Sequence, residues 1–269
     1  MWTRRSPPVF GAESREHESP YGMSPLNIII IGATSDMAAA AARIWAAKGA
    51  SLHLIGRNLA HLEDIAGDLR VRGAGRVACA SMDVLDRESH EAVLLKAWDE
   101  LGRVDVLLFA AGQLPNQSQC EADPSLCRQS LDINFGASAE LLLHAANLFE
   151  KQRSGVVVII GSVAGDRGRR GNFIYGAAKA GLETFASGLR VRLAAAGVHV
   201  LLIKPGFVAT RMTADMRQGA LFTSAEVAGK LIVTAVASGG GTVYLPFWWR
   251  YIMLVICQIP EFVFKRLKI

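Results

Sequence analysis

The chain has 269 residues, of which 51% are hydrophobic and 20% are charged, a balance that excludes a disordered protein and supplies a sizeable core. Its formal net charge of +5 is mild for this length and, without a focused basic stripe, does not indicate a nucleic-acid-binding protein. The four cysteines form no C-x-x-C pair and have no histidine at metal-ligand spacing, so we expect neither a disulfide framework nor a metal site. A reducing cytosol is the simplest setting, and Cys79 and Cys257 are expected to be buried because both lie in apolar runs.

Residues 1–24 differ from the rest of the chain because they combine three prolines with mixed charges and contain no apolar run. A secretory signal needs such a run, so we interpret this stretch as a disordered N-terminal extension. Met23 lies just before the first predicted strand and is an alternative to Met1 as the native start.

From residue 26 onward, apolar runs typical of buried strands alternate with segments whose apolar residues recur at helical spacing. Strands are predicted at Leu26–Ile31, Ser51–Ile55, Arg76–Ser81, Val104–Phe109, Val156–Ile160, Val198–Ile203 and Thr242–Leu245. Helices are predicted at Met37–Lys48, Leu59–Arg72, Arg87–Leu101, Ser125–Lys151 and Phe173–Ala196. A last helix ends at Val236, and Thr223, three residues before Glu226, predicts a capping box at its start.

This alternation predicts an α/β fold: a single doubly wound, Rossmann-type domain over residues 25–246, with a parallel sheet and helices on both faces. Residues 247–269 form a separate hydrophobic and basic tail, expected to be an amphipathic helix. Ligands of such sheets bind beyond the carboxyl ends of the strands, so the residues that follow each strand are the candidate site.

The first strand ends in a turn of small residues that opens a helix. The turn contains Gly32, Thr34, Ser35, Asp36 and Met37, whose backbone N–H groups and positive helix end could meet a pyrophosphate. Asp36 is unfavourable beside a phosphate unless its side chain turns away, for instance to cap the helix. An ordinary strand-to-helix turn is the alternative interpretation.

The second strand is followed by Arg57. Dinucleotide-binding folds place an Asp or Glu here to hold the ribose 2′-hydroxyl, whereas an Arg can pair with the 2′-phosphate of NADP. Arg57 therefore favours NADP(H) as the cofactor, and a solvated loop arginine is the alternative.

Tyr175 and Lys179 are four residues apart, so on a helix their side chains share one face. A phenol with a pKa of about 10 is a poor base at neutral pH, but a nearby ammonium lowers that pKa. The pair could therefore move a proton to or from a carbonyl oxygen while hydride moves to or from its carbon. Ser162 follows the fifth strand, where it could hold a substrate oxygen beside Tyr175, and Asn134 lies in the preceding long helix.

With these residues in this order, the chain resembles the short-chain dehydrogenase/reductase family over residues 26–246. The matching pieces are the turn at Gly32, Asp83-Val84, Ala110-Ala111-Gly112, Asn134, Ser162, Tyr175 with Lys179, and Pro205-Gly206 with Thr210. The resemblance implies that Ser162 orients the substrate carbonyl and that Tyr175 exchanges the proton. It implies further that Lys179 holds the nicotinamide ribose and lowers the tyrosine pKa, and that Asn134 keeps a water in a proton relay.

The resemblance also implies that Asp83 contacts adenine and that Pro205 and Gly206 lie beside the nicotinamide. Further cofactor contacts are expected from Val84, Ala110, Ala111, Gly112, Val208 and Thr210, together with Tyr175 and Lys179. The chain departs from the family pattern at Asp36 and Ala38, which replace two glycines of the phosphate turn, and at Phe109, which replaces an asparagine. The last change puts a structural hydrogen bond in doubt, not the chemistry.

The tail is apolar but is interrupted by Arg250, Gln258, Pro260 and Glu261. A membrane-spanning helix needs about 20 apolar residues, so the tail should not span. Its tryptophans, its tyrosine and its terminal basic residues are typical of a segment that lies in a membrane interface. An arm that covers the substrate cleft or contacts a neighbouring subunit is the alternative.

A glycine-rich loop between Ser162 and Tyr175 contains Arg167, Arg169 and Arg170. Arginines there could hold an anionic substrate group such as a phosphate, or the loop could simply be solvated. Together with the tail, the loop points to a lipid-linked, phosphorylated substrate. The chain also resembles, more distantly, the branch of the family that reduces a polyprenyl-phosphate-linked 2-keto-pentose.

The leading hypothesis is therefore a cytoplasmic NADP(H)-dependent carbonyl reductase or alcohol dehydrogenase, peripheral at the cytoplasmic membrane face and acting on a lipid-linked ketone. The alternatives are a reductase of a free lipid, steroid or soluble ketone, and a non-catalytic NADP(H)-binding interaction protein. The long predicted helices are of a kind that pairs across a two-fold axis in the family, so a homo-oligomer, dimer or tetramer, is expected.

Overall fold

The computed structural model describes residues 25–239 and 241–267; the predicted N-terminal extension and the choice between Met1 and Met23 lie outside them. A seven-stranded parallel sheet has the strand order β3-β2-β1-β4-β5-β6-β9. Its strands are β1 (Asn27–Ile31), β2 (Ser51–Gly56), β3 (Val77–Ser81), β4 (Val106–Phe109), β5 (Gly155–Ile160), β6 (Val198–Pro205) and β9 (Thr242–Leu245). Two short strands, β7 (Val208–Ala209) and β8 (Thr223–Ser224), pair beside it.

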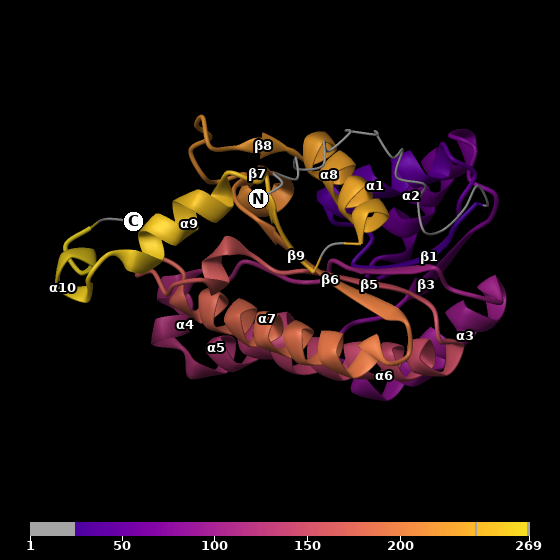
Figure 1. The fold of residues 1–269 in the computed structure, drawn as a ribbon, viewed down its shortest axis with the longest axis horizontal. Helices are drawn as coiled ribbons and strands as arrows, with labels where there is room; N and C mark the ends of the chain where they lie inside the picture. The colour runs from indigo at the N-terminus through magenta and orange to yellow at the C-terminus, as the bar shows by residue number, and fades with distance from the viewer. Residues whose placement is uncertain (1–24, 240, 268–269) are drawn as a thin grey trace, which may run out of the picture.

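Helices cover both faces of the sheet, as Figure 1 shows. On one face lie α1 (Asp36–Ala46), α2 (Leu59–Val71) and α8 (Ala225–Ser238). On the other lie α3 (His90–Leu101), α6 (Ala137–Gln152) and α7 (Phe173–Ala194). Side chains alternate along each strand, so Ile28 and Ile30 of β1 join the first core and Ile29 and Ile31 the second. The predicted doubly wound fold is confirmed.

The predicted helix over Ser125–Lys151 is present, but a π-helical turn divides it into two α-helices. The chain forms α4 (Gln117–Ala122) and α5 (Pro124–Leu131), then a π-helical turn at Asp132–Gly136, and only then α6. Pro124 begins α5 because proline suits the first turn of a helix, where its missing N–H has no partner to lose. A π-turn leaves little trace in the apolar spacing, and such turns are frequent at functional sites.

Two smaller expectations are also corrected. The cap of α8 is Ser224, whose hydroxyl accepts a hydrogen bond from the Val227 backbone N–H at 3.3 Å, while Thr223 belongs to β8. Cys257 is exposed, and Cys79 is only partly buried because it packs against the core from β3, the edge strand of the sheet. The other boundaries agree with prediction to within three residues, and ends of helices and strands are in any case defined only to about one or two residues.

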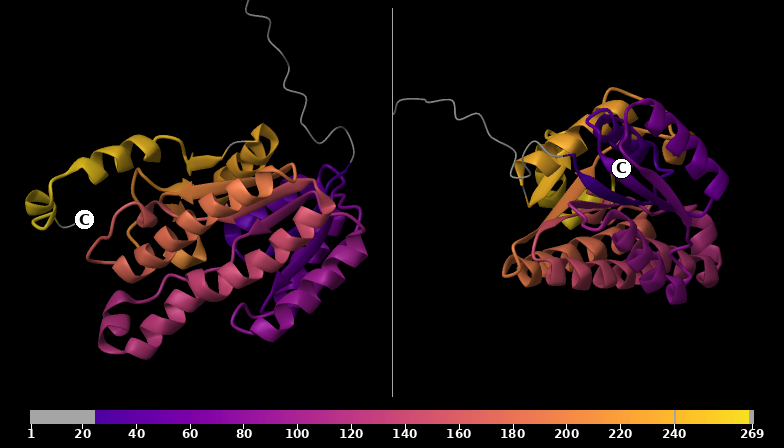
Figure 2. Two further views of the ribbon diagram at one scale, coloured as in Figure 1. Left: turned by 60° about the horizontal axis from the view of Figure 1, so that its bottom comes forward. Right: turned by 90° about the vertical axis from the view of Figure 1, so that its right-hand side faces the viewer.

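After β9 the chain forms α9 (Trp249–Gln258) and α10 (Glu261–Phe264). Figures 1 and 2 show both helices extending past the end of the sheet at which the loops after β5 and β6 lie. Within residues 25–239 and 241–267, no helix has the length and apolar character needed to cross a membrane.

Candidate active site

Two adjoining cavities open at the carboxyl ends of the strands. The first has a volume of about 550 Å³, the second of about 450 Å³, and both are lined by Ala110, Ala111 and Gly112 after β4. The predicted site residues that line the first cavity are Gly32, Thr34, Ser35, Asp36, Met37, Arg57, Asp83, Val84, Ala110, Ala111, Gly112 and Thr210. Those that line the second include Ser162, Tyr175, Lys179, Pro205, Gly206, Val208 and Thr210.

The turn after β1 requires a glycine at position 32. Gly32 has a φ of +78°, and a Cβ on it would lie 2.5 Å from the backbone nitrogen of Ala111. A residue with a side chain would be strained in this left-handed backbone conformation. Its Cβ would also clash with a backbone atom that cannot move aside, so only glycine fits here. The turn therefore lies directly against the segment after β4, and the first cavity opens between them.

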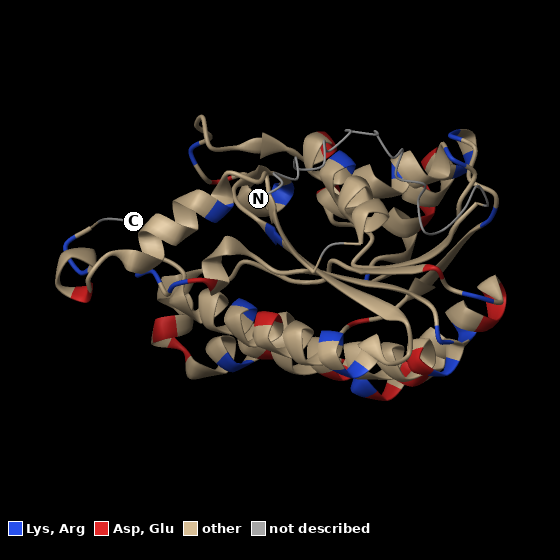
Figure 3. Cartoon of the chain, in the orientation of Figure 1, with Lys and Arg blue, Asp and Glu red and all other residues tan. Residues whose placement is uncertain are grey.

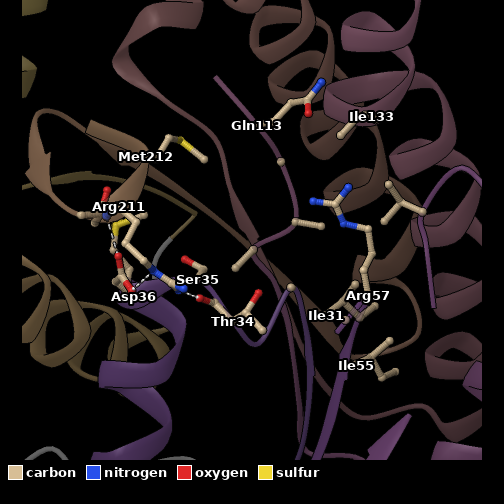
Figure 4. A pocket seen from close by; sticks show the side chains of 18 of the residues that line it. Ile31, Thr34, Ser35, Asp36, Ile55, Arg57, Gln113, Ile133, Arg211 and Met212 are labelled. Carbon is tan, nitrogen blue, oxygen red and sulfur yellow. Dashed lines mark hydrogen bonds and ion pairs between the residues drawn. The ribbon is translucent and has the colours of Figure 1, made fainter. Parts of the chain in front are cut away.

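The Asp36 side chain lies at one side of the first cavity and does not cap α1. Its carboxylate accepts hydrogen bonds from the backbone N–H of Arg211 at 2.8 Å and from the Arg211 Nε at 3.0 Å. Arg211 also donates to the carbonyl oxygen of Thr34, and Figure 4 shows this arrangement at one side of the cavity. No sequence pattern predicts this pair, since its members are 175 positions apart in the chain.

Arg57 is exposed, and its guanidinium extends over the first cavity, opposite Asp36 and Arg211 (Figure 4). Asp83 lies half-buried at the same cavity, where its carboxylate accepts a hydrogen bond from the Leu85 backbone N–H at 3.0 Å. A cation thus stands beside the end of β2, where a ribose phosphate would lie in this type of fold.

The α7 residues Tyr175 and Lys179 lie on one helix face, with the Lys179 Nζ 5.7 Å from the centre of the Tyr175 ring. Lys179 is buried and donates a hydrogen bond to the carbonyl oxygen of Ile160 at 2.9 Å. Burial lowers the pKa of Lys179 to about 8, although the charge of Glu183 opposes this shift. At neutral pH the ammonium therefore remains protonated.

The expected lowering of the Tyr175 pKa is not found in the structure. Burial raises the pKa of Tyr175 to about 12, and a hydrogen bond with Ser162 only partly offsets this effect. The physical reason is that desolvation of the phenolate outweighs the Ser162 hydrogen bond, and the negative charge of Glu183 raises the pKa further. The Lys179 ammonium donates its hydrogen bond to the Ile160 carbonyl oxygen. The phenol is accordingly held in its protonated form, ready to donate.

Asn134 lies in the π-helical turn, where it is fully buried. Its side-chain oxygen accepts a hydrogen bond from the Gln113 backbone N–H at 3.0 Å, and its amide donates to the Ser130 carbonyl oxygen at 3.0 Å. A Cβ at Gly112 would approach this oxygen to 3.0 Å and the Lys179 Nζ to 3.5 Å. Asn134 therefore holds the segment after β4 close to Lys179.

A buried charged cluster, which the sequence did not predict, lies behind the loop of Ser162. Lys204 of β6 pairs with Glu183 of α7 at 2.6 Å and with Asp166, whose carboxylate also accepts a hydrogen bond from the Tyr244 hydroxyl at 3.2 Å. Burial raises the pKa of Glu183 despite its bond with Lys204. Glu183 follows Tyr175 and Lys179 at the same four-residue spacing, and that periodicity was the available signal.

The three arginines of the glycine-rich loop have different surroundings. Arg167 donates to the carbonyl oxygens of Ile256 at 2.6 Å and Ile259 at 2.7 Å, and its guanidinium lies 3.7 Å from the centre of the Phe264 ring. Arg167 thus holds the C-terminal end of α9 and is not a substrate ligand, which corrects that part of the expectation. Arg169 lines the second cavity, and Arg170 is exposed outside it.

The buried face of α9 contacts the walls of the second cavity. Trp249 and Met253 pack with Val163, and the Trp249 ring lies edge-on to Phe207 with centroids 5.1 Å apart. A Cβ at position 206 would overlap the Trp249 ring, so only glycine allows the backbone to lie this close to the ring. One side of the tail is therefore packed against the domain.

Comparison with known proteins agrees with this arrangement. The family model described as short chain dehydrogenase matches residues 26–221. An uncharacterized oxidoreductase of Mycobacterium tuberculosis is 34% identical over 240 residues, covering 89% of this chain and 96% of the relative. One of Streptomyces coelicolor is 36% identical over 247 residues, covering 91% and 97%.

Solved structures share the fold. A short chain dehydrogenase/reductase family protein superposes with a TM-score of 0.73 at 26% identity, over 82% of this chain and 96% of that one. A short-chain type dehydrogenase/reductase from Mycobacterium ulcerans gives a TM-score of 0.72 at 21% identity, over 81% and 87%. The chain belongs to the short-chain dehydrogenase/reductase family and is an oxidoreductase of the kind that uses a nicotinamide cofactor.

Proposed function

We propose that the protein is an NADP(H)-dependent reductase of ketones, acting at the cytoplasmic face of a membrane on a lipid-linked substrate such as a polyprenyl-phosphate 2-keto-pentose. The observation that carries the catalytic part is the shared cavity of Ser162, Tyr175 and Lys179. Because all three functional groups are present, an enzyme is favoured over a non-catalytic NADP(H)-binding protein.

The residues of the second cavity can perform the proton transfer. A reduced nicotinamide, when bound, would supply the hydride. Tyr175, with a pKa of about 12, donates its proton to the carbonyl oxygen, which the Ser162 hydroxyl orients. Lys179, protonated below its pKa of about 8, stabilises the phenolate that is left. Asn134 keeps the backbone after β4 in place, and we assign it the family's role in returning a proton through water.

Arg57 supports NADP(H) over NAD(H), because its guanidinium stands over the first cavity and can form a bidentate pair with a ribose 2′-phosphate. Arg57→Ala should weaken NADPH binding by about tenfold or more and NADH binding by less than about twofold. Isothermal titration of both nucleotides tests this assignment. An equal loss of affinity for NADPH and NADH would refute the role of Arg57 in recognising the 2′-phosphate. The assignment of a nicotinamide dinucleotide as cofactor would then stand without a preference for NADP(H).

The outer face of the tail supports contact with a membrane. Phe247, Tyr251, Leu254, Val255 and Phe262 are all more than half exposed. Figure 3 shows basic residues at the start of α9 and beyond α10, which Arg250, Lys265 and Arg266 supply. An apolar helix face bordered by cations is typical of segments that lie in the headgroup region of anionic bilayers.

A free lipid, steroid or soluble ketone is the second candidate substrate. It is favoured by the wall of the second cavity, whose apolar residues include Leu114, Val163, Phe207, Met212 and Met216. Turnover of a panel that contains the polyprenyl-phosphate 2-keto-pentose, steroid ketones and short ketones separates the two candidates. Reduction of the lipid-linked sugar alone favours the first, and reduction of the other ketones alone favours the second.

A further inference from the structure

The second cavity carries an unbalanced positive charge. Lys179 and Arg169 are its cationic lining residues, and neither Asp nor Glu is among the described residues that line it. The chemistry of the family accounts for Lys179, which lies beside Tyr175. Arg169 has no part in that chemistry, so its presence in a largely apolar cavity needs another explanation.

Arg169 is desolvated without being paired. Its terminal nitrogen donates a hydrogen bond to the carbonyl oxygen of Val163 at 3.3 Å, while its Nε is buried and has no hydrogen-bond partner among the described residues. Burial lowers its pKa, although the charge of Asp166 opposes the shift. That carboxylate is already bound by Lys204 and by the Tyr244 hydroxyl.

A desolvated guanidinium is costly unless an anion pairs with it, and Asp166, the acid whose charge reaches Arg169, is paired with Lys204. The neighbouring Arg167 shows the contrast, since its guanidinium is saturated by backbone carbonyls, Glu261 and the Phe264 ring. Because the guanidinium offers a planar fork of donors, a carboxylate or a phosphate is the group that matches it.

We propose that Arg169 binds an oxyanion carried by the substrate, a carboxylate or a phosphate, while the apolar walls hold the substrate's carbon chain. The substrates are then ketones whose carbonyl reaches Ser162 and Tyr175 while the anion reaches Arg169 inside one cavity of about 450 Å³. The ketone in this inference rests on the proposed reductase function. The anion site does not, because it is argued from the surroundings of Arg169. Arg169 determines specificity, and the proton transfer remains with Tyr175.

The first test compares anionic and neutral ketones as substrates. The probes are octanoates with a ketone at C3, C5 or C7, their methyl esters, and 8-hydroxyoctan-2-one with its phosphate ester. Consumption of NADPH gives kcat/KM for each pair in the wild type, Arg169→Gln, Arg169→Lys and the matched control Arg170→Gln, an exposed arginine of the same loop. The position of the ketone in the best probe gives the spacing between carbonyl and anion.

We expect at least one anion to exceed its neutral partner by about tenfold or more in kcat/KM in the wild type. Arg169→Gln should bring that ratio close to one, Arg169→Lys should give an intermediate ratio, and Arg170→Gln should keep the wild-type ratio. A preference for the phosphate over the carboxylate, or the reverse, identifies the oxyanion. An anion-to-neutral ratio that Arg169→Gln leaves unchanged would overturn the inference.

The second test needs no turnover. Isothermal titration of octanoate and octyl phosphate, with NADP⁺ present, measures the anion site in the same four proteins. Binding that Arg169→Gln weakens by about tenfold, and Arg170→Gln does not, supports the inference even if no ketone is reduced; the reductase function alone would then fail. Equal affinities in both variants would overturn the anion site and leave the reductase function standing. If Arg169→Gln does not fold, Arg169→Lys decides both tests, because its altered donor geometry must still reduce the preference.

Discussion

The Asp36 carboxylate accepts two hydrogen bonds from Arg211, one from its backbone N–H at 2.8 Å and one from its Nε at 3.0 Å. The pair joins the first turn of α1 to the segment after β7, across one side of the first cavity. An acid that would repel a pyrophosphate at the start of α1 is thereby neutralised by an arginine that lines the same cavity.

Arg211→Gln should weaken NADPH binding by about threefold to tenfold, because it leaves the Asp36 carboxylate uncompensated beside the phosphates. In the same background, Asp36→Asn should restore most of the affinity, since the repulsion is then gone. Fluorescence titration with NADPH measures all four corners of this double-mutant cycle. Strictly additive losses would show that the two residues act on cofactor binding independently.

The sequence predicted the sheet and its site residues better than it predicted their surroundings. Strands buried on both faces are continuous apolar runs such as Ile28–Ile31, so the positions of the seven main strands along the chain could be predicted. Tyr175 and Lys179 were visible because helical spacing alone puts them on one face. The Asp36–Arg211 pair has no such signature, since it joins residues that are 175 positions apart.

Two other features depended on tertiary context. The π-turn around Asn134 adds one residue to a helical turn without changing composition, so the long helix was predicted as unbroken. The pKa of Tyr175 was expected to fall because of Lys179, but the sign depends on burial, which raises it to about 12. Sequence spacing establishes that two groups are neighbours, whereas the balance between desolvation and attraction requires the packed structure.

The buried cluster behind Ser162 should contribute to stability through Lys204. Lys204→Met removes the ammonium that pairs with Glu183 and Asp166 and leaves two buried carboxylates facing each other. The free energy of unfolding at pH 7, from urea titration, should fall by about 3 kcal/mol. Arg192→Met, which breaks the exposed pair with Glu150, is the control and should cost less than about 1 kcal/mol.

The loss in Lys204→Met should also depend on pH in a defined direction. Burial raises the pKa of Glu183 in the folded protein, and loss of the Lys204 ammonium removes the charge that opposes this shift. The folded pKa of Glu183 therefore lies above its unfolded value, so the variant gains stability as pH falls and Glu183 takes up a proton. The stability gap to the wild type should therefore be smaller at pH 5 than at pH 7. A gap of equal size at both pH values would mean that the cluster contributes through packing and not through charge.

Lys179 should make cofactor binding sensitive to alkaline pH. Its pKa of about 8 is below the usual value for lysine because of burial, so the ammonium loses its proton as pH rises through about 8. NADPH affinity should then fall by up to about tenfold per pH unit above 8, because the cation that faces the cofactor is lost. Titrations from pH 7 to 9.5 check this, and Lys179→Met should show weak binding with no such decline.

The exposed face of α9 should bind anionic vesicles. Replacing Tyr251, Leu254 and Val255 with serine removes apolar side chains that the domain leaves exposed, so vesicle affinity should fall by tenfold or more. Sedimentation with phosphatidylglycerol vesicles measures it. The control replaces Val71 and Val191, which are exposed on α2 and α7, with serine. The contrary result is a wild type that fails to bind vesicles and sediments as a dimer in analytical ultracentrifugation, while the triple variant sediments as a monomer. That result would contradict membrane binding and identify the face as a subunit contact.

The most direct test of the central claim is consumption of NADPH by the full-length protein over the ketone panel, with Tyr175→Phe beside the wild type. The phenylalanine keeps the ring but cannot donate a proton, so kcat should fall by about a hundredfold or more while NADPH binding persists. That result would establish Tyr175 as the acid of a ketone reductase. Turnover that survives in Tyr175→Phe would contradict the account.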